Sequence, residues 1–355
     1  MAFPVHVEEI GPEWLTAVLR AEGVLARAAV TSVSREHVGE EAGFLSTVGR
    51  CQLTYDRAEP GAPTSVVVKL QPDVAEYAEA ESELHAFTRE VRFYREVAPT
   101  VPLRVPRVYA TPEAGERIAL VMEDLSFARL GDQVAGIHTD QVIAGARAIA
   151  RLQGQYWDNE ALNQLSWMPF KDHFDLDFAD KWPHFLDVYR KELSNEGRRV
   201  GDALCSQMPE VASRIESRPK TLVHQDLRAD NMAFVDGPDG EEPIIFDWAV
   251  AVRSVGAYDV ARLLGGSEPT RERQGHQLEV IRAWHDELVA SGVHDYTRAD
   301  ALLDFRLGAL AVLAIPVHFC ADPPEPGTRS DALFHAIASR LFASVVEIDA
   351  MAALD

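Results

Sequence analysis

The stretch that decides the fold of this chain is His224-Gln225-Asp226-Leu227-Arg228-Ala229-Asp230-Asn231, and the apolar run 244–246 that follows it ends in Asp247. Short apolar runs also flank this loop, at 221–223 and 232–235, and Gly-Pro-Asp-Gly at 237–240 is a strong turn signal. We therefore predict a loop between short strands, with a hairpin that carries Asp247 back toward Asp226 and Asn231.

These three polar residues suit the transfer of a phosphoryl group. That reaction needs one carboxylate to orient and deprotonate the attacking hydroxyl, and two oxygen ligands to hold Mg²⁺ against a triphosphate. Asp226 and Asn231 lie on one loop and can face one cleft, and Asp247 can reach the same cleft. A short turn rich in Asx residues would show the same H-x-D spacing. The flanking strands favour the catalytic interpretation, in which H-x-D-x-x-x-x-N is a kinase signature.

Composition and charge narrow the class of protein. The chain has 355 residues, enough for two domains that share a cleft, and 47% are hydrophobic, as in ordinary globular proteins. The formal net charge of −22 argues against nucleic acid as a partner and mildly favours a neutral or cationic ligand. No stretch approaches the ~20 apolar residues of a membrane span, so we expect no membrane partner.

The expected location is the cytoplasm. The first residues lack the basic and apolar segments of a secretion signal. The three cysteines, Cys51, Cys205 and Cys320, are widely spaced, which fits a reducing compartment better than a disulfide framework. We expect a monomer or a homodimer.

Hydrophobic patterning divides the chain into a β-rich first third and a mostly helical remainder. Strands are expected at 28–38, 45–55, 65–70, 107–109 and 118–122, with helices at 12–19 and 76–97. Further helices are expected at 137–157, 178–195, 200–208, 271–290, 298–314 and 329–351. This order predicts an α+β, two-lobed protein-kinase-like fold. Residues 1–122 would form the nucleotide-covering lobe, 123–127 a hinge, and 128–355 a helical lobe with the catalytic loop and the substrate site.

A single lysine interrupts the β-branched strand 65–70. A kinase needs a cation on the phosphates, and Lys69 on the third strand is the candidate, although an edge-strand lysine that faces solvent would look the same. Its expected ion-pair partner is Glu90, because Glu90 lies on the apolar side of the helical segment 76–97. Glu81 and Glu83 are the competing candidates.

Two further segments are placed by position. Gly39 and Gly43 lie in the turn between the first two strands, where their backbone N–H groups could approach phosphate oxygens, although an ordinary hairpin explains them equally well. Met122, Glu123 and Leu125 lie at the hinge, where they would contact the adenine ring. The G-x-x-x-x-G-K-[ST] pattern of a P-loop enzyme is absent from the sequence.

Asp259 begins another helical segment, Gly256-Ala257-Tyr258-Asp259-Val260-Ala261-Arg262-Leu263-Leu264. Two structural roles are open for Asp259. It could satisfy the free N–H groups of its helix, or it could brace the catalytic loop.

The segments H-Q-D-L-R-A-D-N, I-I-F-D-W and G-A-Y-D-V-A-R-L-L resemble the aminoglycoside phosphotransferase and choline kinase superfamily. E-V-R-F-Y-R-E and L-V-M-E-D-L are most similar to its ecdysteroid-kinase-like branch, and also to the phosphotransferase domain found beside some acyl-CoA dehydrogenases. The resemblance covers roughly Ile10 to Val346. It implies that Asp226 is the catalytic base, Asn231 and Asp247 the magnesium ligands, and Lys69 the phosphate-binding lysine. Gln225 and Trp248 occupy positions where relatives often have small or variable residues.

The expected activity is a Mg-ATP-dependent kinase for a hydroxyl group on a small molecule. Only eleven residues separate Asp247 from Asp259, which leaves no room for the activation segment of a protein kinase. Three alternatives stay open: a kinase for an antibiotic or other xenobiotic alcohol, a metabolic kinase for a hydroxyacyl thioester or steroid-like alcohol, and a nucleotide-binding regulator without activity. An aromatic cluster would favour a bulky, partly apolar substrate if it lines a pocket and not the core. The cluster consists of Trp157, Trp167, Phe170, Phe174, Phe178 and Trp182.

Overall fold

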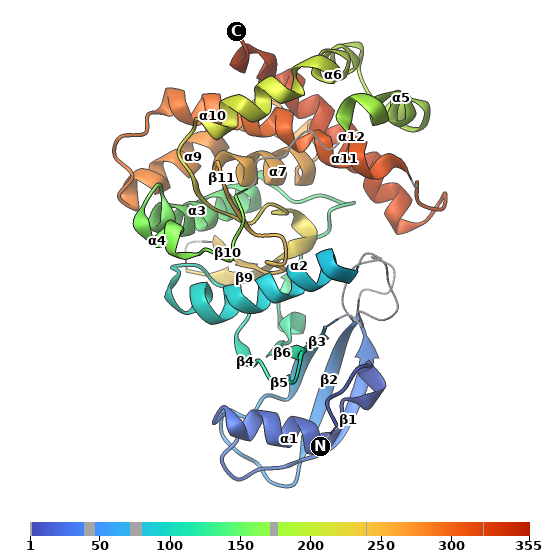
Figure 1. The fold of residues 1–355 in the computed structure, drawn as a ribbon, viewed down its shortest axis with the longest axis vertical. Coiled ribbons are helices and arrows are strands. Elements are labelled where there is room, and N and C mark those ends of the chain that lie inside the picture. The colour runs from blue at the N-terminus through green and yellow to red at the C-terminus, as the bar shows by residue number, and fades with distance from the viewer. Residues whose placement is uncertain (1, 39–46, 72–79, 171–176, 239, 322) are drawn as a thin grey trace. The chain divides into compact units, whose positions relative to one another are not determined.

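The computed structural model describes all residues except 1, 39–46, 72–79, 171–176, 239 and 322, and it has the expected α+β, two-lobed architecture (Figure 1). The chain forms two compact units. Unit 1 comprises Met1–Pro99, Val105–Ala128 and Asp247–Ala249. Unit 2 comprises Thr100–Arg104, Arg129–Phe246 and Val250–Asp355.

Unit 1 is built on an antiparallel sheet with the strand order β1-β2-β3-β6-β4, and β5 pairs with β6. The strands are β1 (Val30–His37), β2 (Thr47–Tyr55), β3 (Ser65–Leu70), β4 (Val108–Ala110), β5 (Glu113–Ala114) and β6 (Arg117–Glu123). One face packs on helix α1 (Pro12–Ala21) through an apolar core. Side chains alternate along β3, so Val66, Val68 and Leu70 enter this core while Lys69 lies on the opposite face. Helix α2 (Ala80–Arg92) continues into a π-helical turn, η3 (Phe93–Val97).

Unit 2 is mainly helical, and its longer helices run from green to red in Figure 1. They are α3 (Thr139–Tyr156), α4 (Glu160–Gln164), α5 (Phe178–Tyr189), α6 (Asn195–Glu216), α7 (Ala257–Ser267), α8 (Thr270–Arg273), α9 (Gln277–Ala290), α10 (Arg298–Val312), α11 (Ala314–His318) and α12 (Arg329–Glu347). Every residue of α7 is buried, including the charged Asp259 and Arg262. Because buried charges need partners, Asp259 and Arg262 are expected to contact polar groups of neighbouring segments.

Short strands carry the quoted loop of unit 2. Strand β8 (Thr221–Val223) pairs with β11 (Val252–Ser254) just before the loop. After the loop, β9 (Met232–Gly237) and β10 (Gly240–Ile245) form a hairpin that β7 (Arg129–Leu130) extends. The hairpin predicted around residues 237–240 is therefore present.

Several helix boundaries differ from the sequence prediction, and the segment 271–290, for example, is divided into α8 and α9. The segment 178–195 is not one helix, because α5 ends at Tyr189 and Ser194 caps α6 by accepting a hydrogen bond from the Gly197 N–H at 3.0 Å. Helix α6 also continues past Met208 to Glu216 with Pro209 inside it. Proline usually ends a helix, which is why the sequence prediction stopped too early.

One segment meets the length and composition of a membrane span, contrary to the expectation from the sequence. A window of 18 residues within Arg298–His318 has a mean hydropathy of 1.6, and 72% of that window is buried inside the protein. A buried apolar helix in the core of a globular unit passes the same test. The apolar character of α10 and α11 is accounted for by their packing in unit 2.

Candidate active site

The predicted catalytic loop lies in unit 2, where the short 3-10 turn η7 (Ala229–Asn231) completes it. Both oxygens of the Asp226 carboxylate accept hydrogen bonds. Oδ1 accepts from Arg262 Nη2 at 2.9 Å, and Oδ2 accepts from Arg228 Nε and Asn231 Nδ2, each at 3.0 Å. The Asp226 side chain is 30% exposed, so a hydroxyl group can still approach it. The loop thus brings Asp226 and Asn231 into contact, while their roles in catalysis and metal binding stay predictions.

The two arginines determine the charge of Asp226. Burial alone would raise the pKa of this carboxyl group, but the positive charges of Arg228 and Arg262 outweigh burial and lower its pKa to about 2. Asp226 is therefore ionised at neutral pH. An ionised carboxylate can accept a hydrogen bond from an attacking hydroxyl group, which is the geometric requirement for a base at this position.

Asp259 fixes the backbone at the start of the loop. Its carboxylate oxygens accept hydrogen bonds from the backbone N–H groups of His224 and Gln225, both at 2.8 Å. Burial raises the pKa of Asp259 to about 7, although these hydrogen bonds act in the opposite direction. Of the two roles that the sequence left open for Asp259, the structure shows the brace for the catalytic loop.

His224 and Gln225 give the loop its shape. Nδ1 of the fully buried His224 accepts a hydrogen bond from the Asp226 N–H at 3.3 Å, so Nε2 carries the proton and donates to the Phe246 carbonyl at 3.0 Å. Gln225 has a φ of 72°, in the left-handed region that residues other than glycine adopt at an energetic cost. This backbone conformation gives a physical reason why a small residue suits position 225, where relatives often have one.

Sequence reasoning missed the roles of Arg228 and Arg262. Arg228 also donates to Asp230 Oδ2 at 2.6 Å, and Arg329 at the start of α12 donates to Asp230 Oδ1 at 2.8 Å. These contacts form a chain of ion pairs, Asp226–Arg228–Asp230–Arg329, that joins the predicted catalytic loop to α12. A signal for Arg262 was available, because it lies three positions after Asp259 and so on the same helix face.

Unit 1 contains a second group of predicted site residues. Lys69 Nζ lies 2.6 Å from Glu90 Oε2 and 3.2 Å from Asp247 Oδ1. Burial would lower the pKa of the Lys69 ammonium, but Asp247 and Glu90 raise it above its ordinary value, so Lys69 stays cationic. The ion pair predicted between Lys69 and Glu90 is present, and its part in binding nucleotide stays a prediction.

An aromatic stack fixes the segment that carries Asp247. The rings of Phe93 and Trp248 have centroids 4.0 Å apart and planes 6° from parallel, and Trp248 is fully buried. Asp247 itself has a φ of 66°. The Trp248 side chain, next to Asp247, therefore packs against Phe93 in this chain.

The two predicted magnesium ligands, each within its own unit, offer an oxygen atom of the kind that Mg²⁺ prefers. The Asp247 side chain is 43% exposed, and the Asn231 amide nitrogen donates to Asp226, which leaves the amide oxygen as the atom for a cation. Among the described residues, no group of three or more His, Cys, Asp or Glu side chains is placed to bind a metal by itself. Mg²⁺ needs only one or two protein ligands when phosphate oxygens and water complete its shell.

The segment 123–127, predicted as a hinge, lies in unit 1 and is anchored by Asp124. Asp124 is 7% exposed and accepts hydrogen bonds from Ser65 Oγ, Arg50 Nε and the Ser126 N–H. The Glu123 side chain accepts from the Arg107 N–H at 3.0 Å. The Met122 side chain is buried and that of Leu125 is partly exposed, and the predicted contact of Met122, Glu123 and Leu125 with adenine stays a prediction.

Not all predicted residues can be placed. Gly39, Gly43 and Phe174 lie outside the described residues. Phe178 and Trp182 stack on each other at 5.7 Å, Trp182 stacks on Phe342 at 5.5 Å, and all three side chains are almost fully buried. Of the two alternatives left open for the aromatic cluster, a pocket or the core, Phe178 and Trp182 belong to the core.

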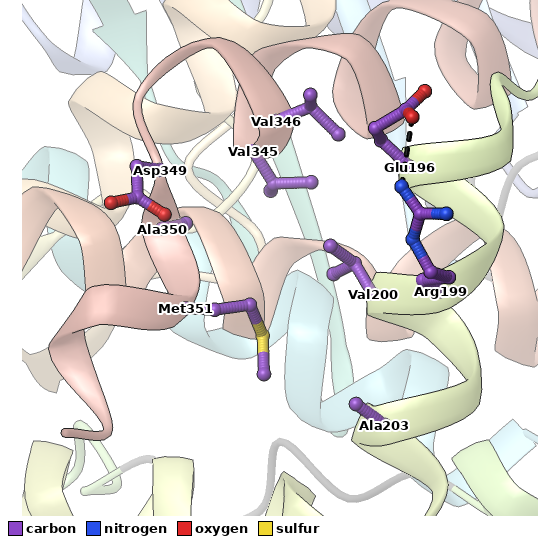
Figure 2. Close-up of a pocket in the computed structure, with 9 residues that line it drawn as sticks. All are labelled: Glu196, Arg199, Val200, Ala203, Val345, Val346, Asp349, Ala350 and Met351. Carbon is purple, nitrogen blue, oxygen red and sulfur yellow. Dashed lines mark hydrogen bonds and ion pairs between the residues drawn. The ribbon is translucent and has the colours of Figure 1, made fainter.

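A cavity of about 290 Å³ lies between α6 and the end of α12 (Figure 2). Apolar side chains of Val200, Val345 and Met351 line it, and a 2.8 Å ion pair between Glu196 and Arg199 lies at its edge. None of the predicted catalytic, metal or nucleotide residues contributes to its wall. It is therefore not a candidate for the acceptor site.

Comparisons with known proteins identify the family and support the fold. The model of the ecdysteroid kinase-like family matches residues 40–293, more than half of the chain. No curated protein matches the sequence. Several solved structures have a similar fold at low sequence identity to this chain. A putative aminoglycoside phosphotransferase from Ralstonia eutropha is 15% identical with a TM-score of 0.56, and the similarity covers 95% of this chain and 96% of that one.

Two further structures have the same fold. A variant of an aminoglycoside 2'-phosphotransferase in complex with GDP is 15% identical with a TM-score of 0.52, and 86% of this chain and 88% of that one are covered. A choline kinase from Cryptosporidium parvum is 9% identical with a TM-score of 0.52, and 89% of each chain is covered.

Proposed function

The chain belongs to the ecdysteroid kinase-like family, and we propose that it is a Mg-ATP-dependent kinase that transfers the γ-phosphate to a hydroxyl group of a small molecule. Among the structures with the same fold, one binds GDP and others are named as aminoglycoside phosphotransferases or choline kinase. Those names describe the other proteins. For this chain, the proposal depends on its own residues.

The observation that carries the proposal is the state of Asp226. Its carboxylate is ionised, held by Arg228, Arg262 and Asn231, and still 30% exposed. A group of this kind can orient a hydroxyl group for in-line attack, and positioning accounts for much of the catalysis of phosphoryl transfer. A regulator without activity would not need an accessible carboxylate held from three sides.

Unit 1 supports the nucleotide part of the proposal. Lys69 is a cation held by two carboxylates, which suits a side chain that must contact the phosphates without moving. Asp247 has an exposed carboxylate for Mg²⁺. When bound, Mg²⁺ would neutralise charge on the phosphate oxygens, and Asn231 and Asp247 are the residues that would hold it.

The identity of the acceptor separates the remaining alternatives. An antibiotic-like amino sugar would be attracted by the acidic chain. A hydroxyacyl thioester or steroid-like alcohol would need apolar surface at the acceptor site, and the buried rings of Phe178 and Trp182 do not supply it. Location in the cytoplasm and a monomeric or homodimeric state are part of the proposal.

The test is an ADP-release screen with Mg-ATP against aminoglycosides, macrolides, choline-like amines, sterols and hydroxyacyl-CoA esters. Product identity is checked by mass spectrometry for the added phosphate. The Asp226→Asn variant is run beside the wild type, because true phosphoryl transfer is lost in it while a contaminating ATPase is not. A screen in which Mg-ATP binds but no acceptor is phosphorylated would support the regulator.

A further inference from the structure

An arginine on strand β11 lies over an exposed aromatic ring in unit 2. The Arg253 guanidinium carbon is 3.8 Å from the centroid of Phe170, and the Arg253 N–H donates to the Pro169 carbonyl at 2.9 Å. Phe170 is 47% exposed, which is unusual for a phenylalanine held in place by a backbone bridge. The ring and the cation therefore form a fixed pair at the surface.

The charge of Arg253 has no carboxylate partner among the described residues. Its Nε is buried without a hydrogen-bond acceptor, and burial lowers the pKa of the guanidinium. Other arginines of unit 2 with low exposure have hydrogen-bond acceptors at the guanidinium group, and the buried Arg340 donates to the carbonyls of Gln133 and Val134. Arg273 pairs with Glu347, and Arg218 pairs with acidic residues of α10. The chain has 56 acidic residues against 34 basic ones, so the lack of an acidic partner for Arg253 in the described part of the chain is not explained by a shortage of carboxylates.

Both strands that position Arg253 continue into the predicted catalytic machinery. Arg253 is paired in register with Leu222 of β8, four residues before Asp226. Four residues of extended chain span at most about 14 Å. In the other direction, β11 leads into α7, which carries Asp259 and Arg262. A ligand of moderate size could contact Arg253 and Asp226 together.

We propose that Arg253 and Phe170 form a subsite for an anionic group of the acceptor, a carboxylate or a phosphate attached to a flat or apolar skeleton. The inference rests on the proposed kinase function and names the class of its substrate. The N–H groups of a guanidinium lie in one plane, and two of them can donate to two oxygens of one anion. This donor pair stays available when the face of the guanidinium lies over a ring. The cation–π contact orients the Arg253 guanidinium before the ligand binds, and the Phe170 ring offers apolar surface beside the guanidinium.

The experiment uses four benzyl alcohols that differ only in the para group: a carboxylate, a phosphate, a carboxamide and an aminomethyl group. Binding of each to the whole protein with a non-hydrolysable ATP analogue and Mg²⁺ is measured by calorimetry, and phosphorylation with Mg-ATP is measured separately. We expect at least one anionic compound to bind about tenfold or more tightly than the carboxamide, because hydrogen bonds to charged groups have this effect. The carboxylate and phosphate arms show which anion is preferred.

Three variants assign the preference to the subsite. Arg253→Gln should weaken the anionic compounds about ten- to a hundredfold and leave the carboxamide unchanged, whereas Arg253→Lys should restore part of the affinity. Phe170→Leu should weaken all four compounds. The matched control is Arg129→Gln, because Arg129 also lies over a ring, that of Phe234 at 5.4 Å, but is paired with Glu241. It should leave the preference intact.

The outcomes separate this inference from the proposed function. If the anionic compounds bind no better than the carboxamide, or if Arg253→Gln changes all four equally together with the melting temperature, Arg253 is a packing residue and the inference is wrong. If the anionic preference depends on Arg253 but neither these compounds nor any acceptor of the ADP-release screen is phosphorylated, the subsite stands and the kinase assignment fails.

Discussion

The indole of Trp248 lies parallel to the ring of Phe93, with centroids 4.0 Å apart, and this contact ties the residue after Asp247 to the turn that follows α2. Glu90 lies one helical turn before Phe93 and pairs with Lys69 at 2.6 Å. One short helical segment therefore positions both partners of Lys69, Glu90 directly and Asp247 through its neighbour.

The Phe93→Leu variant should lose the stack without leaving a large cavity. We expect the KM for Mg-ATP to rise several-fold, because Asp247 becomes less well positioned, and stability to fall by less than about 1.5 kcal/mol. Steady-state kinetics and thermal unfolding measure the two effects. Phe3→Leu is the matched control, since Phe3 makes an edge-on contact with Trp14 elsewhere in unit 1. Equal effects of the two variants on the KM for Mg-ATP would contradict this role of Phe93.

The Asp226→Asn variant should nearly abolish turnover while Mg-ATP binding stays close to normal. The amide keeps the size of the side chain but cannot accept the proton of the attacking hydroxyl, and loss of such a base typically costs ~10²–10⁴-fold in rate. The measurement is kcat with the true acceptor beside a calorimetric titration of Mg-ATP. Turnover within threefold of wild type would remove Asp226 from the catalytic role.

The Asp247→Ala variant should weaken magnesium-dependent nucleotide binding as well as the rate. Asp247 would be the main charged protein ligand of the metal, and such sites depend on one or two carboxylates. Calorimetry with ATP in the presence and absence of Mg²⁺ measures the effect. The prediction fails if the affinity gained from Mg²⁺ is the same in wild type and variant.

The Arg262→Gln variant should change the pH dependence of kcat/KM. The pKa of Asp226 in the folded protein is about 2, below its ordinary value of 3.8, so the ionised form is favoured in the fold. This contribution to stability is present above about pH 3.8 and is lost as the pH falls through about 2. In the Arg262→Gln variant, fewer positive charges oppose the effect of burial, which raises the pKa of Asp226, so this pKa should rise. We expect an acidic limb in kcat/KM at higher pH than in wild type.

The matched control for this experiment is Arg329→Gln, because Arg329 pairs with Asp230 and not with Asp226. Its profile should follow that of wild type between about pH 4 and pH 9. If the Arg262→Gln profile also follows wild type, the charge of Arg262 does not set the pKa of Asp226.

The sequence predicted much of the fold and part of the site, for reasons that differ by residue. Strand β3 and helix α3 follow from local periodicity, and the contact of Asp226 with Asn231 follows from their spacing on one loop. The pairing of Lys69 with Glu90 could be inferred because the apolar stripe of the helix fixes its inward face.

Other features depend on long-range packing that no local pattern contains. Phe178 and Trp182 belong to the core because α5 packs on α6 at Gly201, where an added Cβ would lie 2.2 Å from the Trp182 ring. Arg262 reaches Asp226 across 36 positions of sequence. Such contacts become visible only when the helices are placed against one another.

The π-helical turn after α2 has a consequence for chain length. A π turn contains more residues than an α turn, and the Ala98 N–H accordingly bonds to the Phe93 carbonyl five positions earlier. Deleting one residue from Phe93–Val97 would convert this segment into an ordinary α turn, which closes with one residue fewer, so the later side chains would keep nearly their present directions. A deletion within a regular α-helix instead rotates every later side chain by about 100°. We infer that Phe93–Val97 tolerates the loss of one position better than the preceding turns of α2 do.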